Sequence, residues 1–89
     1  MNKEIREMEE KKLELAISMM IRDVNIFSRY VEKARAKNLP MIEQDYISRI
    51  LGIDRALIHL GWKLEEEGRR TDCKDVEAIE YMHYKAIKR

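Results

Sequence analysis

Two stretches of helical apolar spacing, separated by the only proline, constrain this chain more than any other feature. Pro40 disfavours helical geometry at Leu39 and suits the first turn of a new helix, and Asn38 can adopt the left-handed conformation that ends one. In the first stretch, apolar residues three and four positions apart share one side of a helix; they are Ile17, Met20, Val24, Phe27, Val31 and Ala34. The second stretch has the same spacing, in Tyr46, Ile50, Ile53, Leu57, Leu60 and Leu64. We predict long antiparallel helices over residues 2–37 and 40–67, joined by a short turn.

The C-terminal part of the chain predicts a third, shorter helix over residues 73–88. Gly68 can end the second helix, and Asp72 can serve as the N-cap of the third. The inward-facing residues of this helix would be Val76, Ile79, Met82 and Ala86. Residues that favour strands do not alternate with polar residues for more than a few positions. The predicted fold is therefore all-α: a helical hairpin completed to a three-helix bundle, in a single domain over residues 1–89.

Each long helix also carries a second apolar stripe. On the first helix it consists of Leu15, Met19, Ile26 and Tyr30, and on the second of Ile47, Leu51, Ile58 and Trp62. A two-helix hairpin needs only one stripe per helix, and a third helix of ~24 Å is too short to cover both long helices. A chain of 89 residues is also near the size at which a single core is marginal. We therefore expect self-association, most simply as a two-fold homodimer.

The composition excludes several classes of partner and compartment. The chain has 18 basic and 17 acidic residues and a net charge of +1, which gives no global attraction to nucleic acid or anionic lipid. One cysteine excludes an intramolecular disulfide and a multi-cysteine zinc site, and it suits a reducing compartment. The N-terminus has no apolar core typical of a signal peptide, and no apolar run approaches the length of a membrane span. We predict a cytoplasmic protein with no membrane partner.

The segment from Tyr46 to His59, YISRILGIDRALIH, resembles the turn of the helix-turn-helix family, with LGIDR at its centre. In that family the glycine, here Gly52, makes the tight turn, and the aspartate, here Asp54, caps a recognition helix. The resemblance covers residues 46–69 and implies a DNA-binding regulator as an alternative function. The DNA contacts would then come from Arg49, Arg55, His59 and Lys63. The competing interpretation is one continuous helix, because the apolar spacing passes through Gly52 without a change of phase.

No constellation in the sequence indicates catalysis or a metal. There is no Ser/His/Asp or Cys/His arrangement and no glycine-rich phosphate loop. Small helical chorismate mutases share this length, but their Arg-Glu pair early in the second helix is missing. Glu80 and His83 have the Glu-x-x-His spacing of di-iron bundles, but those sites need two such motifs and further glutamates. We predict no enzyme, no catalytic residue, no metal and no cofactor.

The remaining signals indicate binding of a partner. Arg29, Lys33 and Lys37 lie at intervals of four residues near the end of the first helix, a row that could hold phosphate or an acidic partner. A small anionic ligand bound between subunits at this row is a further alternative. The possible anchors for a protein partner are Trp62, Tyr81 and Tyr84. Our leading interpretation is a non-enzymatic, self-associating helical protein-protein interaction module, a small regulator or inhibitor of a larger protein.

Overall fold

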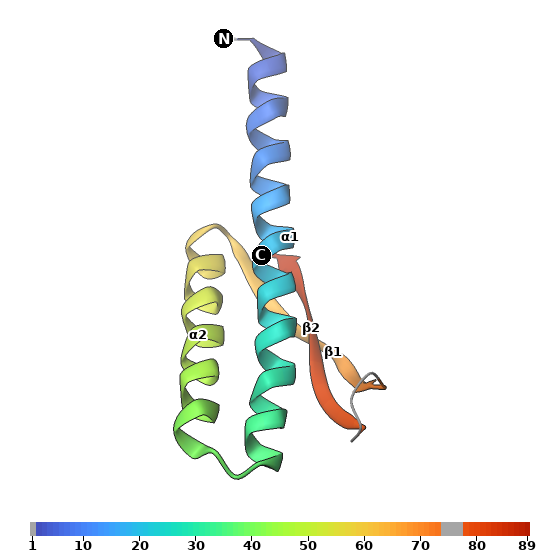
Figure 1. The fold of residues 1–89 in the computed structure, drawn as a ribbon. Coiled ribbons are helices and arrows are strands. Elements are labelled where there is room, and N and C mark those ends of the chain that lie inside the picture. Colours follow the sequence, from blue (N-terminus) through green and yellow to red (C-terminus); the bar gives the residue numbers. More distant parts are fainter. Residues whose placement is uncertain (1, 74–77) are drawn as a thin grey trace.

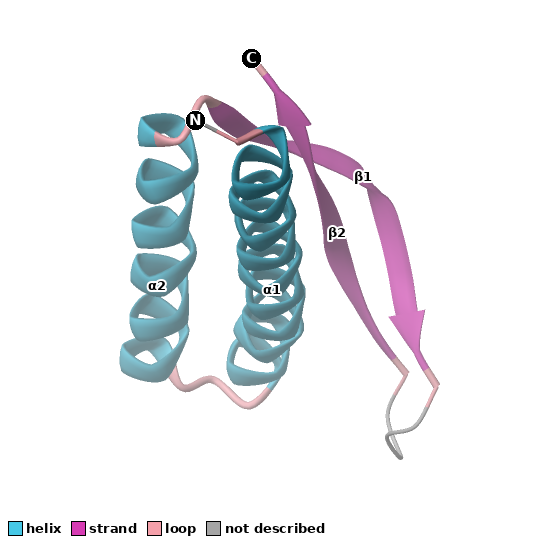
Figure 2. Cartoon of the chain, turned by 90° about the horizontal axis from the view of Figure 1, so that it is seen from above, coloured by secondary structure: helices cyan, strands magenta, loops and turns pink. Residues whose placement is uncertain are grey.

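The computed structural model describes residues 2–73 and 78–89, which form two helices followed by a two-stranded antiparallel sheet (Figure 1). The helices are α1 (Lys3–Ala36) and α2 (Pro40–His59), and the strands are β1 (Trp62–Asp72) and β2 (Ile79–Lys88). The two helices run antiparallel, and the β-hairpin lies on the opposite side of α1 from α2 (Figure 2). The long first helix is therefore the element on which both the second helix and the hairpin pack.

The first helix and its turn begin and end within one residue of the predicted bounds. Asn2 caps α1, because its side-chain oxygen accepts a hydrogen bond of 3.0 Å from the backbone N–H of Glu4. Asn38 takes a φ of 56°, the left-handed conformation that its short polar side chain tolerates. The N–H of Leu39 then donates to the carbonyl of Ala34 at 2.9 Å, and Pro40 opens α2. The local chemistry of asparagine and proline thus sets the reversal of the chain.

The predicted end of the second helix at residue 67 is wrong, because α2 ends at His59. Gly61 has a φ of 83°, and its N–H donates to the carbonyl of Ile58 at 3.0 Å, as in a left-handed helix C-cap. Beyond the glycine, Trp62 and Leu64 are half-buried while their neighbours are exposed, which is the two-residue period of a strand. The helical spacing therefore continues to Leu64 only by coincidence, because Leu64 lies on a strand.

The predicted third helix and the all-α three-helix bundle are also wrong. Ile79–Lys88 forms β2, which pairs with β1 in antiparallel register. The segment is rich in aromatic and β-branched residues, which suit a pleated strand packed against another element; they are Ile79, Tyr81, Tyr84 and Ile87. The apolar residues that indicated a helix are equally compatible with this strand, while Val76 lies outside the described residues. Asp72, the predicted N-cap, instead ends β1 and is buried.

The core is small and lies between the middle of α1 and its neighbours. Its buried apolar residues all belong to the two predicted seams; they are Ile17, Val24, Val31, Ala34 and Leu57. Near the turn, the ring of Tyr46 lies 5.7 Å from that of Phe27 and 5.3 Å from that of Tyr30. Residues 3–16 of α1, which we call the arm, are exposed throughout and project beyond the rest of the fold (Figure 1).

Candidate interaction surfaces

Two polar side chains of α1 hold the inner edge of the β-hairpin. The Asn25 amide donates to the Tyr84 carbonyl at 3.0 Å, and the Tyr84 N–H donates to the Asn25 side-chain oxygen at 2.7 Å. One turn further along, the Ser28 hydroxyl donates to the Met82 carbonyl at 2.6 Å. At Met82 and Tyr84, Asn25 and Ser28 thus supply hydrogen bonds that a neighbouring strand would make, so helix α1 closes the middle of this edge of β2.

This contact was not predicted from the sequence, although the sequence carries a signal for it. Asn25 and Ser28 lie three residues apart, so they share a helix face next to the buried Val24 and Val31. Ser28 is 6% exposed, a position at which a helix normally places an apolar side chain. A polar pair inside an apolar stripe indicates a hydrogen-bonded contact with another backbone. The predicted three-helix bundle contained only apolar contacts between helices and so did not include such a contact.

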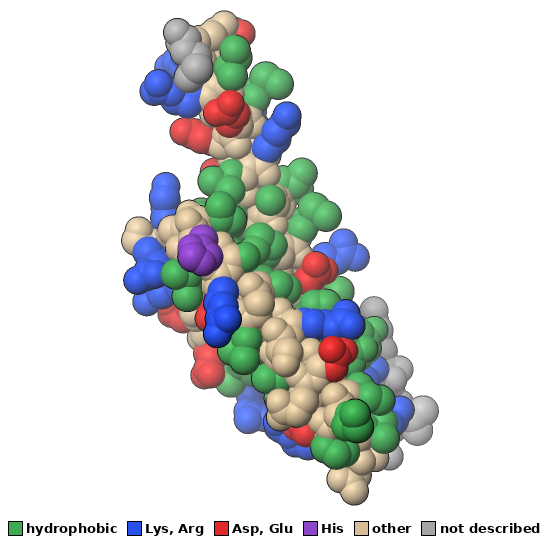
Figure 3. Space-filling model, turned by 90° about the vertical axis from the view of Figure 1, so that its left-hand side faces the viewer, with side chains coloured by type: hydrophobic (Ala, Val, Ile, Leu, Met, Phe, Trp, Pro, Cys, Tyr) green, Lys and Arg blue, Asp and Glu red, His purple; other side chains and the backbone are tan. Residues whose placement is uncertain are grey.

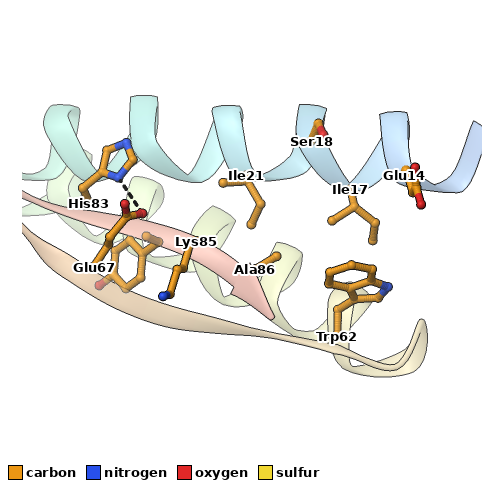
Figure 4. Close-up of a pocket in the computed structure, with 10 residues that line it drawn as sticks. Glu14, Ile17, Ser18, Ile21, Trp62, Glu67, His83, Lys85 and Ala86 are labelled. Carbon is orange, nitrogen blue, oxygen red and sulfur yellow. Dashed lines mark ion pairs between the residues drawn. The ribbon is translucent and has the colours of Figure 1, made fainter. Parts of the chain in front are cut away.

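A groove of about 490 Å³ lies between α1 and the hairpin (Figure 4). Ile17 and Ile21 of α1 form one wall, and Trp62 lies against Ile17 at the end from which the arm emerges. At the other end, Nδ1 of His83 lies 3.5 Å from a carboxylate oxygen of Glu67. The groove thus has an apolar wall of isoleucines facing Trp62, with Glu14 at the end nearest the arm and the Glu67–His83 pair at the other.

The three predicted aromatic anchors do not form one surface. Trp62 and Tyr84 both line the groove beside α1. Tyr81 lies three residues from Tyr84 on the same strand, so it faces the other side of the sheet, and it lines a separate hollow with Arg29. Burial chiefly, and the carboxylate of Glu66 in addition, raise the pKa of the Tyr84 phenol above its ordinary value. Tyr84 therefore belongs to the packed interior of the hairpin more than to a free docking surface.

The predicted basic row on α1 is divided among different contacts. Arg29 forms an ion pair of 3.4 Å with Asp72, whose side chain is almost fully buried. The guanidinium of Arg29 and the amine of Lys33 lie 5.5 and 5.7 Å from the centre of the Tyr30 ring. Lys33 and Lys37 line a hollow beside the turn into α2, which Arg29 does not line. Because Asp72 balances the charge of Arg29, the row does not present three adjacent positive charges to a phosphate or a small anion.

The segment that resembles a helix-turn-helix contains no turn at Gly52. Helix α2 continues through this glycine to His59, and the chain turns only at Gly61. Of the predicted DNA contacts, Arg49 forms an ion pair of 3.2 Å with Asp45 and lies 5.8 Å from the Phe27 ring centre. Arg55 and His59 are exposed on α2, whereas Lys63 lies on β1. The DNA-binding alternative therefore lacks the recognition helix on which it depended.

The Glu-x-x-His pair lies on a strand, where this spacing separates the two side chains. Residues three apart on β2 point to opposite faces of the sheet, so Glu80 and His83 do not converge on one ion. Within residues 2–73 and 78–89, no group of three or more His, Cys, Asp or Glu side chains is placed to hold a metal. Cys73 is exposed and is a free thiol.

An uncovered apolar stripe runs along the arm as far as Met19. Its members lie three, seven and four residues apart, so they follow one side of the helix; they are Ile5, Met8, Leu15 and Met19, with exposed fractions of 48%, 58%, 63% and 60%. On α2, Leu51 and Ile58 of the second predicted stripe are also exposed. Figure 3 shows hydrophobic side chains on the projecting part of the molecule, interspersed with both signs of charge. No helix in the described part of the chain is long and apolar enough to cross a membrane.

Comparison with known proteins assigns no relative to this arrangement: no family model, curated protein or solved structure matches the chain.

Proposed function

We propose that this protein is a non-enzymatic, self-associating interaction module that uses the arm as a docking helix for a larger partner protein, which it regulates or inhibits. The observation that carries the proposal is the apolar stripe on a helix segment whose residues are all exposed. An exposed stripe with helical spacing is the surface by which an amphipathic helix enters an apolar groove on another protein. Leu15 and Met19 lie where the arm joins the body, so the stripe continues from the arm onto the packed part of α1.

The dimensions of the chain support a role in association. Its accessible surface is 6899 Å², whereas a compact monomer of this mass exposes about 5,500 Å². Its radius of gyration is 15.7 Å, against about 12 Å for a compact domain of this length. The excess of about 1,400 Å² is more than the ~800 Å² that one partner contributes to a standard interface. The protein therefore has room for a full interface without any change of its own fold.

The charges of the arm indicate the chemistry of the partner. Residues 3–14 contain four basic and five acidic side chains, a net charge of −1. Such a segment is not attracted to nucleic acid or to anionic lipid, both of which select basic helices. The partner surface that fits is an apolar protein groove or helix face, bordered by charges of both signs. This supports a protein partner in place of a polyanion.

The test compares three baits in an extract of the native host. The first is the wild-type protein, and the second carries Met8→Glu and Leu15→Glu in the apolar stripe. The third carries Lys3→Gln and Arg6→Gln, which change the net charge by the same two units on the polar side of the arm. Circular dichroism establishes that all three are folded. Wild type and the polar-side variant should retain the same partner, and the stripe variant should lose it.

A competition experiment then isolates the arm. Once the retained protein is purified, a synthetic peptide of residues 1–20 should displace the wild-type protein from it. If all three baits retain the same proteins, or the peptide does not compete, the arm is not the docking element.

A further inference from the structure

The outer edge of β1 is a second uncovered feature, and its chemistry differs from that of the arm. Strand β2 pairs with β1 on one side, and on the other side Asn25 and Ser28 bond its backbone at Tyr84 and Met82. In the described part of the chain, no backbone hydrogen bond joins the outer edge of β1 to another segment. Figure 2 shows β1 as the element farthest from α2 along much of its length. Its N–H and C=O groups are open to another strand.

A bulge in β1 determines which of its charged side chains share a face. Glu66 is opposite Tyr84, and Arg69 is opposite Met82. Tyr84 and Met82 are two residues apart on a regular strand, so their side chains share a face of the sheet. Their partners Glu66 and Arg69 therefore share that face too, although they are three positions apart. Likewise Glu65 is opposite Lys85 and Arg70 is opposite Tyr81, which places Glu65 and Arg70 together on the other face. The register shift between Glu66 and Gly68 produces both pairings.

We propose that two copies of this chain pair through the outer edges of β1, antiparallel, about a two-fold axis between Glu67 and Gly68. In this register Glu66 lies opposite Arg69 of the second copy, and Glu65 lies opposite Arg70 of the second copy. Residues directly opposite in an antiparallel pair must share a face, and the bulge satisfies that condition for both pairs at once. Two-fold symmetry doubles them to four cross-strand pairs of opposite charge.

The distribution of charge along β1 explains why its outer edge would pair with a second copy of the same chain. A charged edge strand normally resists pairing with another strand. Here Glu65 and Glu66 precede the bulge and Arg69 and Arg70 follow it, so an antiparallel copy meets an opposite charge at each of these four positions. Within one chain, Arg70 has an ion pair of 3.6 Å with Glu67, but both side chains are largely exposed, and such a pair is readily exchanged. Asp72 is held by Arg29 and is not needed for the pairing.

This inference rests on the self-association in the proposed function and specifies its interface. The result would be a four-stranded sheet in which α1 of each copy closes the outer edge. Along α1, Ser28 contacts Met82 and Asn25 contacts Tyr84, so β2 runs antiparallel to the helix. Because the two-fold axis reverses the strand direction, the two arms would project from opposite ends of the dimer. Each dimer would thus present two docking helices to partner proteins.

The test uses charge reversal and complementation, with mass measured by sedimentation equilibrium from 5 to 200 µM. One variant carries Glu65→Arg and Glu66→Arg, and the other carries Arg69→Glu and Arg70→Glu. Each alone places like charges opposite one another and should raise the dimer dissociation constant at least ~30-fold, on the scale of four cross-strand charge pairs. An equimolar mixture of the two should form a heterodimer as tight as the wild-type dimer.

The control is Lys88→Glu with Arg89→Glu, the same double reversal at the exposed end of β2, which should leave the mass unchanged. A wild-type protein that stays monomeric at 200 µM contradicts both self-association and this interface. A dimer that survives both reversals, or a mixture that does not re-form one, contradicts only the β1 interface and leaves self-association through another surface. The heterodimer forms in the mixture only when both variants are folded. Its appearance therefore shows that neither variant lost its own dimer through misfolding.

Discussion

The two halves of α1 both carry apolar residues at helical spacing, but these side chains are buried in one half and exposed in the other. From Ile17 onward, the inward residues of the helix are buried by α2 and the hairpin. Before Ile17, every described residue is exposed. Ile5, Met8 and Leu15 also have helical apolar spacing, but they lie on the side of the second stripe, which is exposed at Met19 as well. The hairpin has the same asymmetry, since α1 closes the edge of β2 and nothing in the described part closes that of β1. Amphipathic spacing therefore identifies which side of an element will be covered, but not what covers it.

Identical substitutions in the two regions should have the most different effects. Leu57 is fully buried, and Leu57→Asp places a charge in the core at a cost of several kcal/mol, comparable with the whole stability of a domain of this size. Leu15→Asp, on the exposed stripe, should change the free energy of unfolding by less than ~0.5 kcal/mol. Thermal unfolding followed by circular dichroism measures both. A folded Leu57→Asp protein would show that the assignment of the core is wrong.

Removing the hydrogen bonds between Asn25 and the backbone of β2 should have the next largest effect on stability. Asn25→Ala leaves a part-buried N–H and C=O of Tyr84 without their side-chain partner, at a cost of about 1–3 kcal/mol. The amide of Tyr84 should also exchange its hydrogen much faster, as NMR would report. Asp23→Ala, at an exposed position two residues away, is the matched control and should be neutral. Equal effects of the two substitutions would mean that Asn25 does not hold the strand.

Alanine substitutions at Gly52, inside α2, and at Gly61, just after its end, should change the free energy of unfolding in opposite directions. Gly61 needs its φ of 83°, so Gly61→Ala should destabilise the fold by about 1–2 kcal/mol. Gly52 lies inside α2 with open space around it, so Gly52→Ala should stabilise the fold by up to ~1 kcal/mol. Urea titration of both variants measures the difference. Stabilisation by Gly61→Ala would place the end of α2 elsewhere.

The smallest effect should come from the titration of Tyr84 at alkaline pH. Its pKa is raised above the ordinary value of 10.0, chiefly by burial, so the folded state favours the protonated phenol. That contribution is intact below pH 10 and is lost as the pH rises through the folded pKa, because the unfolded chain gives up the proton first. Tyr84→Phe should therefore lose less stability between pH 9 and pH 11 than wild type, measured by urea midpoints. An identical decline in both proteins would contradict this environment.

The helical part of the fold was predictable because its determinants are local. The spacing of apolar residues, Asn38 and Pro40 define α1 and the turn from sequence alone. The hairpin was not predictable in the same way, because its strands are stabilised by partners distant in sequence. Met82 and Tyr84 meet α1 more than fifty positions away, and no local pattern carries that information. Only Gly61 gave a local sign that the second helix ends early.

The candidate surfaces were predictable in part. The sequence indicated surplus apolar stripes on both long helices, and the exposed Leu15, Met19, Leu51 and Ile58 belong to those stripes. The basic row failed as a phosphate site, because Asp72 approaches Arg29 from an element predicted to be a helix cap. The charge pattern of β1 had no meaning while residues 65–67 were assigned to a helix. It becomes interpretable only once the strand register and its bulge are known.

The most direct measurement of the central claim is hydrogen exchange along α1 in the purified protein. We propose that the arm stays uncovered and available to a partner, even when two copies associate through β1. Amides of residues 5–16 should then exchange at least ~100-fold faster than those of residues 20–34, because only the latter lie under tertiary packing. Uniform protection along the whole of α1 would contradict the claim, since it would mean that the arm is already covered in the protein alone.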